Sequence, residues 1–247
     1  MVTIRCGSYI FEGIQAIAFD KDGTLADSHP FLWQLAHQRV NLIAQQFPGV
    51  EADLLQAFGV RGDRLDLAGL MAVGTRPENE IAAAAYLAAR GCAWQEAKTI
   101  TQKAFIQADQ QCRKADHTPP FADIRELLTS LHHAGVAIAV LSGDSTPNVQ
   151  DFLARYELTA WIQYAAGSTA SLAKPDPAFL WQACTALKIE AKATLVIGDA
   201  TTDLELANQA RAAGSIGVTW GGAAQTDLGG ATAIASKPTD IQIEPSF

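Results

Sequence analysis

The feature that most constrains the fold is a series of short apolar runs, each of which stops at a polar or glycine-containing loop. The clearest runs cover residues 14–19, 136–141, 194–197 and 215–218, with weaker ones at 161–165 and 231–235. Helical patterns separate them at 121–134, 147–156, 177–187 and 202–213. Strands that alternate with helices predict a parallel sheet covered by helices on both faces. A small hairpin is expected before it, at 2–6 and 9–11.

One long segment interrupts this alternation. Residues 29–117 contain no convincing strand but several helical stretches, at 31–46, 77–90 and 94–112. We interpret this segment as an all-helical insertion that leaves the sheet directly after its first strand. The chain has 247 residues, 49% of them apolar, which suffices for one large core and a smaller satellite. The predicted domains are therefore 1–28 with 118–247, and 29–117.

Charge and composition exclude several classes of protein. The formal net charge of -8 gives no positive field for nucleic acid or an anionic membrane. Four scattered cysteines form no zinc or disulfide pattern, the N-terminus lacks the apolar region of a signal peptide, and no apolar stretch is long enough to span a bilayer. We expect a soluble, cytoplasmic protein, monomeric or homodimeric, that has no nucleic-acid or membrane partner.

Two carboxylates follow the first strand of the predicted sheet. Asp20 and Asp22 lie on the loop that ends it, at the edge where parallel sheets bind ligands. One carboxylate can attack a phosphoryl group while its neighbour moves a proton to the leaving group and from water. Short acidic pairs are also common in surface turns, so the pair alone leaves a purely structural role equally open.

A second acidic cluster follows the run at 194–197. Asp199 suits a direct magnesium ligand, and Asp203 suits a ligand or a support for one, because magnesium prefers oxygen ligands and takes few carboxylates. The alternative is helix capping, since Thr201 or Thr202 followed by acidic residues is a good helix start. Capping would not explain Asp199 at the end of the strand.

Three further residues suit the binding of a phosphoryl group. Ser142, at the end of the 136–141 run, offers a hydroxyl donor, and the Gly143 backbone can approach a phosphate closely. Lys174, before Pro175, supplies a compact positive charge. A lone lysine in a loop is usually just solvated, so Lys174 gains weight only from the other residues.

Taken in chain order, these residues resemble a known set of motifs. Asp20-Lys21-Asp22-Gly23-Thr24-Leu25-Ala26-Asp27-Ser28, Ser142, Lys174-Pro175 and Gly198-Asp199-x-x-x-Asp203 resemble the four motifs of the haloacid dehalogenase-like hydrolase superfamily. The chain looks most similar to phosphoglycolate phosphatase-like members with a helical cap, and the 218–221 segment, Val-Thr-Trp-Gly, is similar to that group too. The resemblance implies a Rossmann-like three-layer α/β core, with 29–117 as the cap domain.

The resemblance also implies a role for each motif residue. Asp20 is the nucleophile and a magnesium ligand, and Asp22 is the general acid and base and a ligand through its backbone carbonyl. Ser142 binds the transferred phosphoryl group, Lys174 steadies it and the nucleophile, and Asp199 binds Mg²⁺ with Asp203 close by. The acidic Asp22 favours a phosphoester substrate, because relatives that cleave carbon–halogen or carbon–phosphorus bonds lack an acid there.

Two positions depart from the motifs. Lys21 stands where an apolar residue is common between the two aspartates, and we expect it to point away from the metal. Asp144 stands where relatives often have an amide or a small residue, and a second anion facing phosphate would be repulsive. We expect Asp144 to turn outward beside Thr146-Pro147, a plausible helix start.

Substrate choice in cap-bearing relatives depends on the cap. Arg61, Arg64 and Arg76 are the candidates here, because arginine binds carboxylates and phosphates through two hydrogen bonds. Their alternative role is to solvate the surface. We predict a magnesium-dependent phosphatase for a small phosphorylated metabolite, acting through an aspartyl phosphate. The alternatives are a sugar phosphomutase of the same superfamily and a non-catalytic phosphometabolite-binding protein.

Overall fold

The computed structural model describes residues 1–66 and 69–245, and these form two compact units. One unit consists of Met1–Asp27 and Pro119–Phe247, and the other of Ser28–Thr118. We call them the sheet unit and the inserted unit. Residues 67–68 and 246–247, which fall in the predicted domain ranges, lie outside the described residues.

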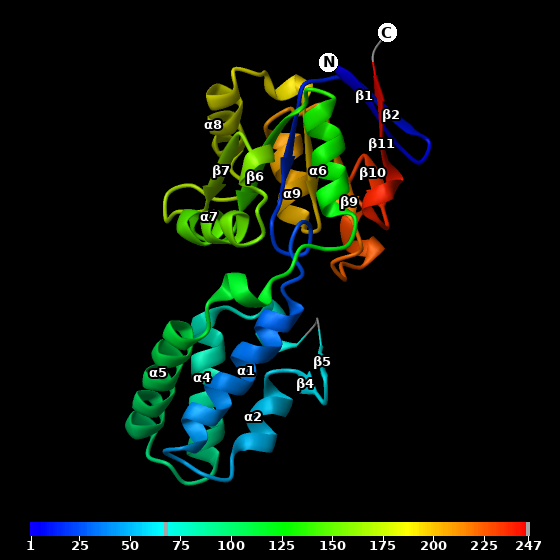
Figure 1. Ribbon diagram of the computed structural model, residues 1–247. Helices are drawn as coiled ribbons and strands as arrows, with labels where there is room; N and C mark the ends of the chain where they lie inside the picture. The colour runs from blue at the N-terminus through cyan, green and yellow to red at the C-terminus, as the bar shows by residue number, and fades with distance from the viewer. Residues whose placement is uncertain (67–68, 246–247) are drawn as a thin grey trace. The chain divides into compact units, whose positions relative to one another are not determined.

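The sheet unit is built on a six-stranded parallel sheet with the strand order β10-β9-β8-β3-β6-β7 (Figure 1). Its strands are β3 (Ala16–Phe19), β6 (Ala137–Ser142), β7 (Tyr164–Gly167), β8 (Thr194–Gly198), β9 (Gly214–Val218) and β10 (Ala233–Ala235). Its helices are α6 (Ile124–His133), α7 (Thr146–Arg155), α8 (Pro177–Leu187) and α9 (Thr201–Gln209). All six predicted strands and all four predicted helices are confirmed, with ends shifted by up to a few residues.

The two faces of this sheet have separate cores. Along β3, Ile17 and Phe19 belong to a cluster that includes side chains of α6 and α7. Ala18, between them, belongs to a second cluster with α8 and α9. Successive side chains of a strand point to opposite faces, so helices cover both sides, as predicted. The small alanine on the second face allows those helices to approach closely.

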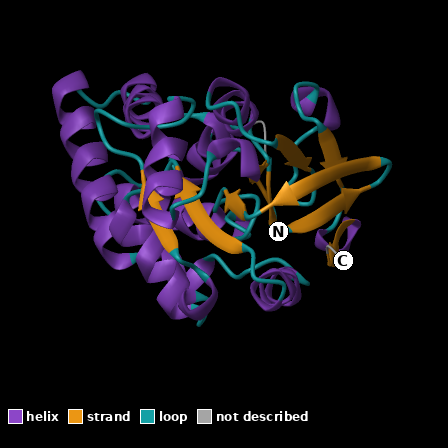
Figure 2. Ribbon diagram, turned by 90° about the horizontal axis from the view of Figure 1, so that it is seen from above, coloured by secondary structure: helices purple, strands orange, loops and turns teal. Residues whose placement is uncertain are grey.

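A separate three-stranded antiparallel sheet joins the two ends of the chain. Its order is β11-β1-β2, with β1 (Val2–Cys6), β2 (Tyr9–Ile14) and β11 (Ile241–Pro245). The predicted N-terminal hairpin is confirmed, and β11 is an addition that the sequence did not indicate. Figure 2 shows this sheet beside the marked chain ends.

The inserted unit is mainly helical. Its helices are α1 (His29–Ala44), α2 (Glu51–Ala57), α3 (Leu70–Val73), α4 (Arg76–Ala89) and α5 (Trp94–Gln111). The expectation that it is all-helical is wrong in one respect, since β4 (Val60–Arg61) pairs with β5 (Arg64–Leu65). Gly62, with φ of +64°, makes the tight turn between them. Strands of two residues are too short to leave an alternating pattern in the sequence.

The inserted unit has its own core. Buried apolar side chains of α1, α2, α4 and α5 form one cluster, in which Phe58 and Phe105 pack edge to face with their ring centroids 6.2 Å apart.

The four cysteines, Cys6, Cys92, Cys112 and Cys184, are free and buried. Within 1–66 and 69–245, no helix has the length and apolar character needed to cross a membrane.

Candidate active site

The candidate site lies at the carboxyl ends of three neighbouring strands. In the sheet order, β3 lies between β8 and β6. Asp20 directly follows β3, Ser142 ends β6 and Asp199 directly follows β8. The Asp20 N–H donates to the carbonyl of Ile197 at 2.8 Å, so Asp20 continues the pairing of the sheet and is held by its backbone. The topology thus brings together residues that are up to 179 positions apart.

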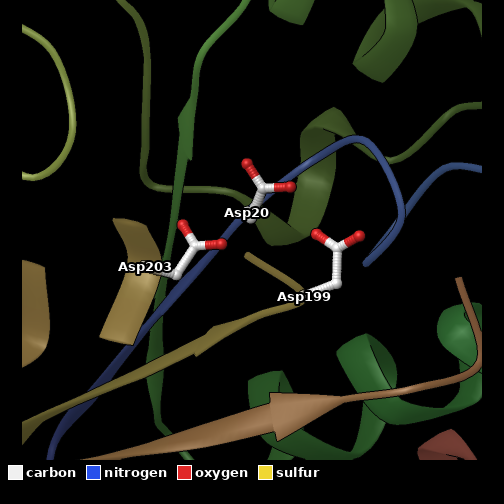
Figure 3. A group of neighbouring side chains, drawn as sticks. All are labelled: Asp20, Asp199 and Asp203. Carbon is white, nitrogen blue, oxygen red and sulfur yellow. The ribbon is translucent and has the colours of Figure 1, made fainter. Parts of the chain in front are cut away.

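Three carboxylates converge at this edge. Asp20, Asp199 and Asp203 each offer an oxygen within 4.8 Å of the others, and Figure 3 shows the three side chains grouped together. Asp20 is 7% exposed and Asp203 only 1%. We call these three residues the carboxylate cluster. Buried anions at such spacing require compensation by positive charge, because their repulsion is weakly screened away from water.

Lys174 supplies part of that charge. Its ammonium Nζ donates to Asp20 Oδ1 at 2.5 Å and to Asp203 Oδ1 at 2.6 Å, and its side chain is only 9% exposed. Asp203 uses its other oxygen, Oδ2, to accept from the Ala200 N–H at 3.1 Å, at the start of α9. Asp203, rather than Thr201 or Thr202, therefore caps the start of α9, and its other oxygen belongs to the carboxylate cluster.

The pKa values reflect this crowding. Burial raises the pKa of Asp20 to about 6, with Asp203 and Asp22 adding to the rise and Lys174 opposing it. Burial and the charges of Asp20 and Asp203 raise the pKa of Asp199 to about 8. Burial disfavours the Lys174 cation, but its ion pairs with Asp20 and Asp203 outweigh this and raise its pKa. One lysine does not neutralise three acids, so the cluster favours a further cation.

The loop after Asp20 is shaped to fit against Asp199. Gly23 has a φ of +80°, and a Cβ there would lie 1.9 Å from Asp199 Oδ2. A Cβ on Gly221 would in turn lie 2.0 Å from the Gly23 carbonyl oxygen. The indole of Trp220 donates to the carbonyl of Thr24 at 2.9 Å. The 218–221 segment, which resembles phosphoglycolate phosphatase-like proteins in sequence, therefore packs against the loop that carries Asp22.

Ser142 and Gly143 occupy the loop after β6. Ser142 is 1% exposed, and its Oγ accepts from the Asp144 N–H at 3.1 Å, which leaves the hydroxyl hydrogen to donate. Gly143 is exposed, and a Cβ on it would meet no heavy atom within 4 Å. The space beside the Gly143 backbone is therefore open, as close approach of a ligand requires.

Lys21 and Asp144, the two departures from the motifs, contact each other. Lys21 Nζ lies 2.6 Å from Asp22 Oδ1 and 3.5 Å from Asp144 Oδ2, and the Lys21 side chain is 1% exposed. Asp144 Oδ1 accepts from the Ser145 N–H at 2.9 Å and from Asn148 Nδ2 at 2.7 Å. Asp144 therefore does not turn fully outward as expected. Its side chain is 14% exposed, and Lys21 offsets its charge.

Sequence reasoning missed Thr24 as well as this pairing. Thr24 is fully buried, and its Oγ1 lies 3.5 Å from Asp199 Oδ1. The signal was present, because Thr24 belongs to the first motif.

The expected helix start at Thr146-Pro147 is one residue late, since Ser145 is the N-cap and its side chain accepts from the Asn148 N–H.

The three arginines proposed for substrate choice lie in the inserted unit. Arg61, in the β4–β5 hairpin, is 79% exposed and pairs with Asp66 at 3.3 Å. Arg64 is also exposed. Arg76, at the start of α4, pairs with Glu80 at 3.4 Å and with Asp109 at 3.2 Å. Their role in substrate choice stays a prediction.

The chain is similar to several known proteins. A family model described as haloacid dehalogenase-like hydrolase matches residues 14–211. The phosphoglycolate phosphatase of Photobacterium profundum is 29% identical over 85% of this chain and 86% of its own, and that of Pectobacterium atrosepticum is 30% identical over 84% and 81%. A crystal structure of a predicted phosphoglycolate phosphatase from Haemophilus somnus superposes with a TM-score of 0.64 at 20% identity, covering 92% of this chain and 96% of that one.

Proposed function

The chain belongs to the haloacid dehalogenase-like hydrolases and is a phosphoglycolate phosphatase-like phosphatase, and we propose that it hydrolyses a small phosphate monoester with Mg²⁺ through an aspartyl phosphate on Asp20. The observation that carries the proposal is the carboxylate cluster with Lys174 inside it. Few other roles explain three acids and a lysine at the ligand-binding edge of a parallel sheet.

The donor set fits magnesium. The cluster offers oxygen ligands from Asp20, Asp199 and Asp203, and it carries more negative than positive charge. The backbone carbonyl of Asp22 is the further ligand that we propose. When bound, Mg²⁺ would screen the repulsion between the anionic nucleophile and an anionic phosphate, and would stabilise charge on the phosphoryl oxygens.

The first half-reaction transfers the phosphoryl group to Asp20. Lys174 binds Asp20 Oδ1, which leaves Oδ2 as the attacking oxygen. This oxygen forms a bond to phosphorus while the bond from phosphorus to the leaving oxygen breaks. The leaving oxygen takes a proton from the Asp22 carboxyl, so that an alcohol departs and Asp22 becomes a carboxylate.

The second half-reaction returns the enzyme to its starting state. Asp22, now a carboxylate, takes a proton from a water molecule, whose oxygen attacks phosphorus. The bond from phosphorus to Asp20 breaks, which releases inorganic phosphate and restores both carboxyl groups. The Ser142 hydroxyl, the Gly143 N–H and the Lys174 ammonium are the groups that we propose to hold the phosphoryl oxygens in both steps.

The substrate class is a small phosphorylated metabolite. Both curated relatives described above are named phosphoglycolate phosphatases, which makes 2-phosphoglycolate the first compound to test. We propose that the inserted unit acts as a cap and selects the substrate, with Arg61, Arg64 and Arg76 as candidates to bind an anionic group. A cytoplasmic location and a monomeric or homodimeric state remain predictions.

The test is phosphate release from a panel of phosphorylated metabolites that includes 2-phosphoglycolate. Wild type is compared with Asp20→Asn, with a chelator control, and with Asp227→Asn, which removes an exposed carboxylate of the sheet unit outside the site. We expect release that both Asp20→Asn and the chelator abolish and that Asp227→Asn leaves intact.

Other outcomes would favour the alternatives. An isomerised product with a bisphosphate intermediate would identify a phosphomutase. Binding of a phosphorylated metabolite with Mg²⁺ but no release from any compound, with folded protein, would indicate a binding protein.

A further inference from the structure

Lys21 is a buried cation that contacts the neighbour of the nucleophile. Its side chain is 1% exposed, its Nζ lies 2.6 Å from Asp22 Oδ1, and the ring of Phe152 lies below it with the centroid 5.6 Å away. Burying an ammonium is costly unless it is paired, so a lysine at this position requires carboxylate partners. Its location is also specific, because the partners are Asp22 and Asp144 rather than the carboxylate cluster.

Asp144 anchors this contact to a rigid element. Its Oδ1 binds the Ser145 N–H and the Asn148 side chain at the start of α7, and its Oδ2 lies 3.5 Å from Lys21 Nζ. The Asp144 N–H also donates to Ser142 Oγ at 3.1 Å. One chain of contacts therefore runs from α7 through Asp144 and Lys21 to the Asp22 side chain.

We propose that Lys21 and Asp144 are positioning residues that hold the Asp22 carboxyl in the place from which it gives a proton to the leaving group. This proposal rests on the acid–base role of Asp22 in the proposed function. Without the cation, Asp22 and Asp144 would repel each other, and the contact that Lys21 makes between Asp22 and the β6–α7 loop would be lost. Proton transfer depends strongly on such placement.

The dependence of the rate on the leaving group distinguishes a misplaced general acid from a general loss of folding or substrate binding. Proton donation matters more when the leaving group is a poor one. p-Nitrophenyl phosphate has a leaving group that departs readily without a proton, whereas phenyl phosphate, of similar shape, has one that needs it. The parameter kcat/KM covers the steps up to the departure of the leaving group, so the ratio of the two kcat/KM values reports on the acid.

The experiment compares Lys21→Met with Lys192→Met in the full-length protein with Mg²⁺. Lys192 is 80% exposed and pairs with Glu190, so its substitution removes one charge outside the site. We expect Lys21→Met to lower kcat/KM on phenyl phosphate by about 30-fold and on p-nitrophenyl phosphate by about threefold, a fraction of the effect of losing a general acid. Lys192→Met should change neither value.

Two further variants keep the test decisive. Asp22→Asn should show the largest difference between the two substrates, and its failure to do so would reject the acid–base role of Asp22 itself. Asp144→Asn keeps an oxygen for the α7 contacts and is expected to fold even where Lys21→Met does not. It should shift the ratio in the same direction by about threefold. Lys21→Met with Asp144→Asn should be no worse than Lys21→Met alone, because the two act as one unit.

Equal losses on both substrates for Lys21→Met and Asp144→Asn, beside a normal substrate difference for Asp22→Asn, would overturn the proposal while leaving the proposed function intact. Unchanged activity in both variants would overturn it too. A preserved Mg²⁺ dependence in Lys21→Met, together with the shifted ratio, would support it, because a disrupted site would lose both.

Discussion

Lys21, in the loop after β3, and Lys174 are both buried, and they differ in the charge that surrounds them. Lys174 lies among three carboxylates and binds two of them at 2.5 and 2.6 Å. Lys21 lies between two carboxylates, at 2.6 and 3.5 Å. The first group has three carboxylates for one ammonium and the second has two, so the first keeps the larger excess of negative charge. This difference separates a site that favours a divalent cation from an ion pair that fixes side-chain position.

The largest difference in kcat between the two lysine groups is expected when the proposed nucleophile, Asp20, is replaced. Asp20→Asn should lower kcat by at least about 10⁴-fold, because an amide cannot attack phosphorus, whereas Asp144→Asn should cost no more than about tenfold. Steady-state phosphate release with saturating Mg²⁺ measures both. Comparable losses for the two variants would show that the lysine groups are not functionally distinct.

The next largest effect concerns the metal. Asp199→Asn should raise the Mg²⁺ concentration for half-maximal activity by about 100-fold, since it removes a charged oxygen ligand. Asp144→Asn should leave that concentration within about twofold. Activity titrated with Mg²⁺, with calorimetric binding as a check, provides the measurement. A Mg²⁺ requirement unaffected by Asp199→Asn would place the ion elsewhere.

The carboxylate cluster should make the stability of the protein depend on pH. The pKa values of Asp20 and Asp199, about 6 and 8, lie above that of an unfolded aspartate, about 3.9. The folded metal-free protein therefore holds protons that the unfolded chain has released. Its stability falls as pH rises from about 3.9, and the contribution of each group is lost once pH passes its folded pKa, about 6 for Asp20 and about 8 for Asp199. We expect Tm to drop by about 5 °C between pH 6 and pH 8.5.

The same thermal scan tests the metal. Mg²⁺ should raise Tm more at pH 8.5 than at pH 6, where it must displace protons to bind. Asp199→Asn should flatten the pH dependence, and Asp227→Asn should keep it. A metal-free Tm that rises over this interval would contradict the charge argument.

The smallest effect is expected in the inserted unit. Arg61→Ala removes an exposed guanidinium whose partner is Asp66, and surface pairs contribute little to stability. We expect unchanged Tm and a rise in KM of about threefold for an anionic substrate, with kcat retained. Arg90→Ala, which breaks the pair with Asp53 in the same unit, is the matched control.

Much of the sheet unit could be predicted because its signals are local. A run such as 194–197, followed by Gly198-Asp199, identifies both a buried strand and a polar loop at its end. β11 was not predicted because it pairs with β1 from the other end of the chain. Neither segment carries a signal that identifies the other as its partner.

The candidate site residues could be named from the sequence for a similar reason. The contacts between their side chains could not be predicted. The order of Asp20, Ser142, Lys174 and Asp199 along the chain indicated one edge of a sheet. The contact between Lys21 and Asp144 depends on β3 and β6 being neighbours, which single positions do not reveal. A lysine in a loop is normally exposed. Lys21 is buried because its two carboxylate partners compensate for the loss of hydration of its ammonium.

The central claim is that Asp20 carries the phosphoryl group, and trapping that species tests it most directly. Protein quenched in acid during turnover of its best substrate is treated with borohydride, which reduces an aspartyl phosphate to homoserine, and the modified position is read by peptide mass spectrometry. The account predicts homoserine at residue 20 in wild type and none in Asp20→Asn. Homoserine at another aspartate, or none at all while phosphate is released, would contradict it.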